Sequence, residues 1–298
     1  MSNNIVIATS ISPIDERGVQ PAAIASWLDH GCTVVSVNNR DEMMALAPAF
    51  PNVTFVEAER TAERFTGRPV PYIFDMIQAA RNIAQPGQVI GLTNADIFLR
   101  SIEGLTAFLC AEAQGCLILG PRVDVSGTES LSNYKPSEKP DYSQGYDFFL
   151  MDQEIVEHFG DSPFAIGMPF WDYWLPLTAH LAGCTLKTLH MPVALHVAHE
   201  TQWNDTIYLF FHALIAYTLE QSRNGVEGNT AEQRQLLFML DVFSHIYGHI
   251  FESGTANQEG VAPDPASTAA LAELYDLFQE AAIHTVKSNA NSIRLNDA

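Results

Sequence analysis

Val89-Ile90-Gly91-Leu92-Thr93-Asn94-Ala95-Asp96-Ile97-Phe98-Leu99 is the stretch that decides the fold. Its first half is an apolar run of residues that favour strands, and it leads into a small polar cluster. The carboxylate of Asp96 is therefore expected at or near the end of a strand, beside Asn94. Open α/β sheets bind their ligands outside the carboxyl ends of their strands. A turn former or a helix N-cap is the alternative role for an aspartate in this place.

Strand-like runs alternate with helical patterns on the N-terminal side of this stretch. Strands are expected over residues 4–10, 33–37 and 53–56, and helices over residues 20–30, 43–47 and 72–83. This alternation predicts an α/β fold, with a mostly parallel sheet and crossover helices on both faces.

The pattern continues beyond residue 99 and then changes. It predicts helices over residues 102–113 and 175–181, and strands over residues 116–119, 145–151 and parts of 185–199. Residues 126–144 are polar and rich in turn formers, which favours a functional loop. From Thr206 the spacing is helical over residues 207–220, 231–251 and 268–286, and residues 288–298 are expected to be a frayed tail.

Two parts are therefore expected along the chain. Residues 1–205 form an α/β domain, and residues 206–298 form a helical C-terminal region. The helical region either packs on the sheet or provides a homo-oligomer contact.

Composition excludes several classes of protein. A chain of 298 residues with 47% hydrophobic residues is large enough for a substantial core and is not globally disordered. The net charge of −20 argues against general binding to nucleic acid or to an anionic membrane. The sequence has no apolar run of membrane-spanning length and no export signal at its start, so a cytoplasmic location is expected.

Positive charge is scarce, with 15 lysines and arginines against 35 acidic residues. An anionic ligand approaching such a protein needs local positive charge or a metal ion. The basic residues near polar motifs are therefore of interest: Arg17, Arg60, Arg64, Arg68 and Arg122.

Polar side chains also follow the first two expected strands. Thr9 and Ser10 end the first strand, and Asn38 follows the second. Early strand ends of a doubly wound sheet form one crevice, which suits a nucleoside. Ordinary loop capping is the alternative explanation for these residues.

An aspartate among aromatic residues forms a further candidate. Asp172 lies between Trp171 and Trp174 in the block 167–174. A partly dry setting raises the pKa of a carboxyl and tunes it as a base, and aromatic faces suit sugar rings. The alternative is that the tryptophans are core anchors and that Asp172 caps a helix.

Two histidines close the α/β part, at His196 and His199. Their spacing of three differs from the spacing of four found in helical zinc motifs. On an extended segment they would point to different faces, so one is expected to bind metal and the other to be structural. The alternative is that both are polar residues with ordinary hydrogen-bond partners.

Taken in order, these motifs resemble the GT-A type of nucleotide-sugar-dependent glycosyltransferases. The resemblance spans roughly residues 4–205 and rests on the motifs Ser10–Pro13, Asn94–Asp96, Tyr146–Phe149, Gly167–Trp174 and His196–Glu200. It implies a GT-A-like, Rossmann-like sheet, a nucleotide-diphosphosugar donor and a hydroxyl acceptor. It also implies a divalent metal, Mn²⁺ or Mg²⁺, on Asp96 and on His196 or His199, with Asp172 as the catalytic base. Asn94 departs from the usual acidic residue at its position.

The remaining roles rest on strand-end position, on positive charge and on aromatic character, and not on the resemblance. Donor contacts are expected from Thr9, Ser10, Asn38, Asn94, Arg60 and Arg122, and acceptor contacts from Trp171 and Trp174. Two alternatives stay open. A nucleotidylyltransferase would need a glycine-rich first loop with a basic residue, which residues 11–18 do not provide. A non-catalytic protein of this fold would bind only a sugar or a partner.

Overall fold

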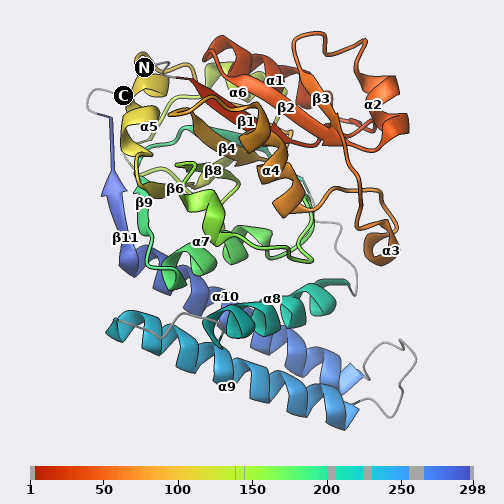
Figure 1. The fold of residues 1–298 in the computed structure, drawn as a ribbon, viewed down its shortest axis with the longest axis vertical. Helices are drawn as coiled ribbons and strands as arrows, with labels where there is room; N and C mark the ends of the chain where they lie inside the picture. The colour runs from red at the N-terminus through yellow and green to blue at the C-terminus, as the bar shows by residue number, and fades with distance from the viewer. Residues whose placement is uncertain are drawn as a thin grey trace.

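The computed structural model describes residues 4–137, 139–143, 145–199, 206–223, 230–254 and 265–295. An eight-stranded sheet forms the centre, in the order β11-β9-β6-β8-β4-β1-β2-β3 (Figure 1). All neighbouring strands are parallel except where β8 pairs with β4 and β6. The strands are β1 (Ile5–Thr9), β2 (Thr33–Asn38), β3 (Thr54–Glu57), β4 (Val89–Thr93), β6 (Cys116–Gly120), β8 (Phe148–Met151), β9 (Thr185–Leu189) and β11 (Ala290–Ile293).

Helices cover both faces of this sheet, which confirms the predicted fold class. They are α1 (Gln20–Asp29), α2 (Arg40–Leu46), α4 (Ile73–Ile83), α5 (Leu105–Glu112) and α7 (Trp171–Leu181), with a 3-10 helix at Ile155–His158. The short helix α3 (Glu63–Thr66) buries no residue, and α6 (Thr128–Asn133) packs on a second, smaller sheet. Alternate residues of β1 face opposite cores. Ile5 and Ile7 join the core that contains Trp27 of α1, while Val6 and Ala8 join the core that contains α4 and α7.

A second, three-stranded sheet carries His196 and Arg122. It has the order β5-β10-β7, from β5 (Ile97–Leu99), β10 (Ala194–Val197) and β7 (Arg122–Val125). The stretch 89–99 is therefore split, because β4 belongs to the large sheet and β5 to the small one. Residues 94–96 link the two sheets. β7 was not predicted from the sequence, and α6 lies inside the segment expected to be a functional loop.

The C-terminal helices pack on the sheet through α7. They are α8 (Thr206–Arg223), α9 (Ala231–Gly254) and α10 (Pro265–Asn289), and they form a layer beside the sheet (Figure 1). Phe211 of α8 and Phe278 of α10 share one core with the strands. The boundary expected at residue 205 lies outside the described residues, and the two-domain division stays a prediction.

The end of the chain corrects the expectation of a frayed tail. Residues Ala290–Ile293 form β11, which pairs in parallel with β9 at the edge of the large sheet. The strand forms because α10 returns the chain to an unpaired sheet edge, whose backbone groups need partners. Phe238, Val242 and Ile246 are exposed at a spacing of four along α9, and a homo-oligomer contact through these helices stays a prediction.

Helix α7 begins four residues earlier than expected. Phe170, just before it, has φ of 75°, and it alone among the non-glycine residues of the described parts has a positive φ. This conformation costs on the order of 1–3 kcal/mol. Burial of the Phe170 ring against Phe211 and Tyr275 holds it in place. The turn sets where α7 starts and so where Asp172 lies.

None of the helices in the described parts of the chain combines the length and the apolar character needed to cross a membrane.

Candidate functional site

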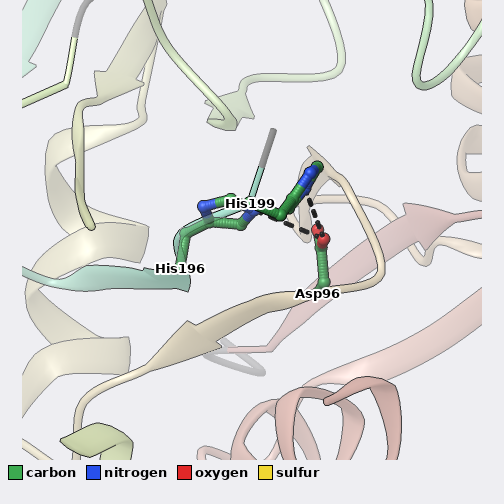
Figure 2. Close-up of side chains that lie close together, drawn as sticks. All are labelled: Asp96, His196 and His199. Atoms are coloured by element: carbon green, nitrogen blue, oxygen red, sulfur yellow. Dashed lines mark ion pairs between the residues drawn. The ribbon is translucent and has the colours of Figure 1, made fainter. Parts of the chain in front are cut away.

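Asp96, His196 and His199 come together at one point, and we call them the Asp96 cluster. One ligand atom from each lies within 4.8 Å of the others. Both imidazole rings approach the same carboxylate (Figure 2): Nε2 of His196 lies 3.4 Å from Asp96 Oδ2, and Nε2 of His199 lies 3.8 Å from it. Residues a hundred positions apart in the sequence thus form one compact group of potential metal ligands.

Sheet pairing explains the meeting. β10 runs antiparallel to β5, with His196 opposite Ile97, so His196 lies beside the turn that carries Asp96. The strand ends at Val197, and His199 follows beyond it. The two histidines are therefore not on one extended segment. The expectation that the two histidines point to different faces holds only for an extended segment. It does not apply here, and both rings reach Asp96.

A chain of charged contacts extends from the Asp96 cluster. Arg17 donates to Asp96 Oδ2 at 2.9 Å and to the carbonyl oxygen of Val197 at 2.8 Å. On the other side, His196 Nδ1 lies 2.7 Å from Asp124 Oδ1. The contacts continue through Arg122 to Asp147, with Arg122 Nε donating to Asp124 at 3.1 Å and Nη1 to Asp147 at 2.7 Å.

We call this set the charged network: Arg17, Asp96, His196, Asp124, Arg122 and Asp147. It contains three carboxylates against two guanidinium groups. Asn94 joins it by donating to Asp147 Oδ1 at 2.9 Å. The amide of Asn94 thus fills a donor role that an aspartate could not, which explains the departure from an acidic residue there.

Burial and charge pull the pKa values of the network in opposite directions. Burial alone would raise the pKa of Asp96, but His196 and Arg17 outweigh it and hold that pKa well below its usual range. Burial lowers the pKa of His196, whereas its hydrogen bonds to Asp124 and Asp96 raise it above the usual value overall. The hydrogen bond from His196 is the largest cause that lowers the pKa of Asp124. Asp96 is therefore ionised at neutral pH.

Asp172 lies next to the far end of the charged network. It is in the first turn of α7, and its Oδ2 packs closely on Gly145. Desolvation and the nearby charge of Asp147 raise its pKa from 3.8 to about 7, against backbone N–H donors that lower it. A carboxyl with such a pKa exchanges its proton readily at neutral pH.

The two tryptophans beside Asp172 are core residues in this structure. Trp174 is fully buried and stacks on Phe164, and Trp171 is 3% exposed and packs on Phe149. Neither indole offers an open face to a sugar ring in this structure, and acceptor contacts by Trp171 and Trp174 stay a prediction without support from the geometry. The alternation of aromatic residues reflected the packing of α7 on the sheet instead.

Polar side chains at the ends of β1 and β2 mostly bind one another. Asn38 is fully buried, and its Nδ2 donates to Ser10 Oγ, to the carbonyl oxygen of Ile11 and to Glu42. Thr9 Oγ1 is buried without a hydrogen-bond partner. Donor contacts by Thr9, Ser10 and Asn38 stay a prediction.

Arg60 makes its contacts elsewhere. Its guanidinium pairs with Asp75 and Asp161 and lies over the ring of Tyr72. None of these residues belongs to the charged network. The geometry therefore supports Arg122, and not Arg60, as the basic residue beside the Asp96 cluster.

Sequence reasoning missed three members of the network. Asp124 was not singled out, because no strand was predicted over residues 122–125. Asp147 was noted within the Tyr146–Phe149 motif without a role. Arg17 was flagged for its charge but not placed at the site. Scarcity of positive charge was the signal that could have found Arg17.

Comparisons with known proteins show likeness of fold alone. No family model matches the chain, and a search of curated proteins finds no match. Among solved structures, the chain is similar to a mannosyltransferase from Pyrobaculum calidifontis in complex with GDP-Man and Mn²⁺, at 13% identity over 96% of this chain and 86% of that chain, with a TM-score of 0.41.

Two further solved structures are similar at lower identity and over less of this chain. A 4-diphosphocytidyl-2C-methyl-D-erythritol synthase from Anaerococcus prevotii has 10% identity over 72% of this chain and 97% of that chain, with a TM-score of 0.41. The inositol-1-phosphate CTP transferase from T. maritima has 10% identity over 71% and 95%, with a TM-score of 0.36. At these values the likenesses assign no activity, ligand or metal to this chain.

The donor set of the Asp96 cluster fits a divalent ion. Ligand atoms about 2.1 Å from one ion lie roughly 3.0 Å apart at cis positions and roughly 4.2 Å apart at trans positions of an octahedron. The separations of 3.4 and 3.8 Å to Asp96 Oδ2 exceed the cis distance by less than about 1 Å, so small side-chain movements would bring the three atoms to one ion. Two imidazole nitrogens with one carboxylate oxygen suit Mn²⁺ better than Mg²⁺, which prefers oxygen ligands.

Proposed function

We propose that this chain is a glycosyltransferase that moves a sugar from a nucleotide-diphosphate donor to a hydroxyl acceptor with the help of a divalent metal. The observation that carries the proposal is the convergence of the Asp96 cluster with the rest of the charged network at the junction of two sheets. A cation site bordered by arginines suits an anionic ligand, because both phosphate and metal find opposite charge there.

Asp96, His196 and His199 would hold the ion, which when bound supplies positive charge to a departing diphosphate. Arg17 and Arg122 donate N–H groups to phosphate oxygens from the two sides of the cluster. Both guanidinium groups are partly exposed, at 34% and 25%, so a ligand can reach them. Asn94 orients Asp147 by donating to its Oδ1.

Asp172 takes the proton of the acceptor hydroxyl as that oxygen attacks the anomeric carbon. A pKa of about 7 means that the carboxyl is substantially ionised at neutral pH and can still accept a proton efficiently. The position of Asp172 beside Asp147 brings it near the network without placing it among the metal ligands.

A thermal-shift panel tests the proposal. Nucleoside diphosphates are added with and without Mn²⁺. The nucleoside diphosphate of one base is expected to raise the melting temperature, and only when the metal is present. The size of the rise depends on the ratio of ligand concentration to Kd. Asp96→Ala should lose this shift and retain its fold. Glu57→Gln removes the same charge from an exposed ion pair with Arg40 and should keep the shift. Equal shifts with and without metal would contradict the proposal.

A further inference from the structure

Asp124 lies beside His196 on the side away from Asp96. β7 and β10 pair in parallel with Asp124 opposite His196, so the pair is set by sheet register. The Asp124 Oδ1 to His196 Nδ1 distance is 2.7 Å, shorter than the 3.4 Å from Nε2 to Asp96 Oδ2. The His196 side chain is only 4% exposed, and each of its two ring nitrogens faces a carboxylate.

We propose that Asp124 is a positioning residue, which accepts the Nδ1–H of His196 and so directs the Nε2 lone pair at a metal held by Asp96. The presence of a metal at this site rests on the proposed function, whereas the orientation of the His196 ring does not. A neutral imidazole carries one proton, and the shorter hydrogen bond decides which nitrogen keeps it. Metal-binding histidines commonly donate their other N–H to a carboxylate, which fixes the ring and strengthens the ligand.

Arg122 holds the Asp124 carboxylate in place. Its Nε donates to Asp124 Oδ1, the same oxygen that faces His196, while its Nη1 is fixed by Asp147. Strand register alone places Asp124 opposite His196, and the ion pair with Arg122 adds a further hold on its carboxylate. Arg17 donates a hydrogen bond to Asp96 Oδ2, the oxygen that faces His196 Nε2. This oxygen is therefore a weaker acceptor for a ring proton of His196.

The first experiment reads the ring itself, without metal. Long-range ¹H–¹⁵N correlation of His196, recorded where the ring is neutral, should show the Nδ1–H tautomer in the wild type. Asp124→Ala should shift the ring toward Nε2–H, because only Asp96 is then left as an acceptor. Asp124→Asn keeps an oxygen that can accept the proton and should preserve Nδ1–H. A wild-type ring with Nε2–H, or an unchanged tautomer in Asp124→Ala, would overturn the proposal.

The second experiment measures Mn²⁺ binding from the signal of the free ion in electron paramagnetic resonance. Asp124→Ala should bind Mn²⁺ about 10- to 100-fold more weakly than the wild type, with Asp124→Asn in between. Unchanged affinity in Asp124→Ala would refute the positioning role. Absence of Mn²⁺ binding by the wild type would count against the proposed function, and the tautomer would still decide the role of Asp124.

Two controls separate this role from a structural one. Arg122→Gln removes the ion pairs of Arg122 but leaves Asp124 opposite His196, so the Nδ1–H tautomer should persist. Loss of that tautomer in Arg122→Gln would assign the effect to Arg122 and overturn the proposal. Glu57→Gln, at the end of β3, changes the net charge by the same amount as Asp124→Ala. It should match the wild type in both measurements.

Discussion

Asp172→Asn should stabilise the protein at alkaline pH, because the native carboxyl is held where its charge is costly. Desolvation and the neighbouring Asp147 raise the pKa of Asp172 from 3.8 to about 7. The folded protein therefore keeps a proton between these pH values that the unfolded chain has lost. Stability from this group is present below pH 3.8 and declines as the pH rises toward 7, by about 4 kcal/mol in total.

Asparagine at position 172 does not titrate, so the free energy of unfolding of the variant does not fall with pH through this group. Roughly 2–3 kcal/mol of the difference between the two proteins should develop between pH 5 and pH 8. At about 2 °C per kcal/mol for a chain of this size, the gap in melting temperature should widen by roughly 5 °C. The amide is nearly isosteric and retains an oxygen to accept the backbone N–H that Asp172 now accepts from Tyr146.

The assay is calorimetry of both proteins at pH 5 and pH 8. Asp276→Asn, on the exposed face of α10, controls for the loss of one negative charge. Asp172→Asn should also lower sugar transfer by about 10²- to 10⁴-fold, since it removes the proposed base. A stability gap that is equal at the two pH values would refute the reasoning, as would an Asp172→Asn variant that is less stable at pH 8.

Three further predictions concern the charged network and the core around α7. Arg17→Gln should tighten Mn²⁺ binding by roughly three- to fivefold and weaken binding of nucleoside diphosphates, because Arg17 competes for Asp96 Oδ2; weaker Mn²⁺ binding in titration calorimetry would contradict this. Asn94→Asp should lower the urea midpoint, since it replaces a donor to Asp147 by a like charge; an unchanged midpoint would count against it. Trp174→Ala should cost about 3–5 kcal/mol in urea unfolding. Weakened acceptor binding at unchanged stability would instead restore Trp174 as an acceptor contact.

The sequence by itself determined the fold class and the position of the central aspartate. Alternating strand and helix patterns required a mostly parallel sheet, and the apolar run 89–93 required a buried strand with polar residues at its end. These are local properties, since side-chain periodicity and backbone preference are written in neighbouring residues. Asp172 could likewise be singled out as a carboxyl among aromatic residues.

Only the tertiary structure decided which of these residues meet. The pairing of β10 with β5 and β7 brought both histidines to Asp96 and placed Asp124 against His196, although β7 carries little strand signal of its own. The same packing buried the two tryptophans, tied Arg60 to other carboxylates and recruited the C-terminal residues as β11. Contacts between distant segments depend on which sheet edge each strand joins, and that choice follows from the packing of the whole chain.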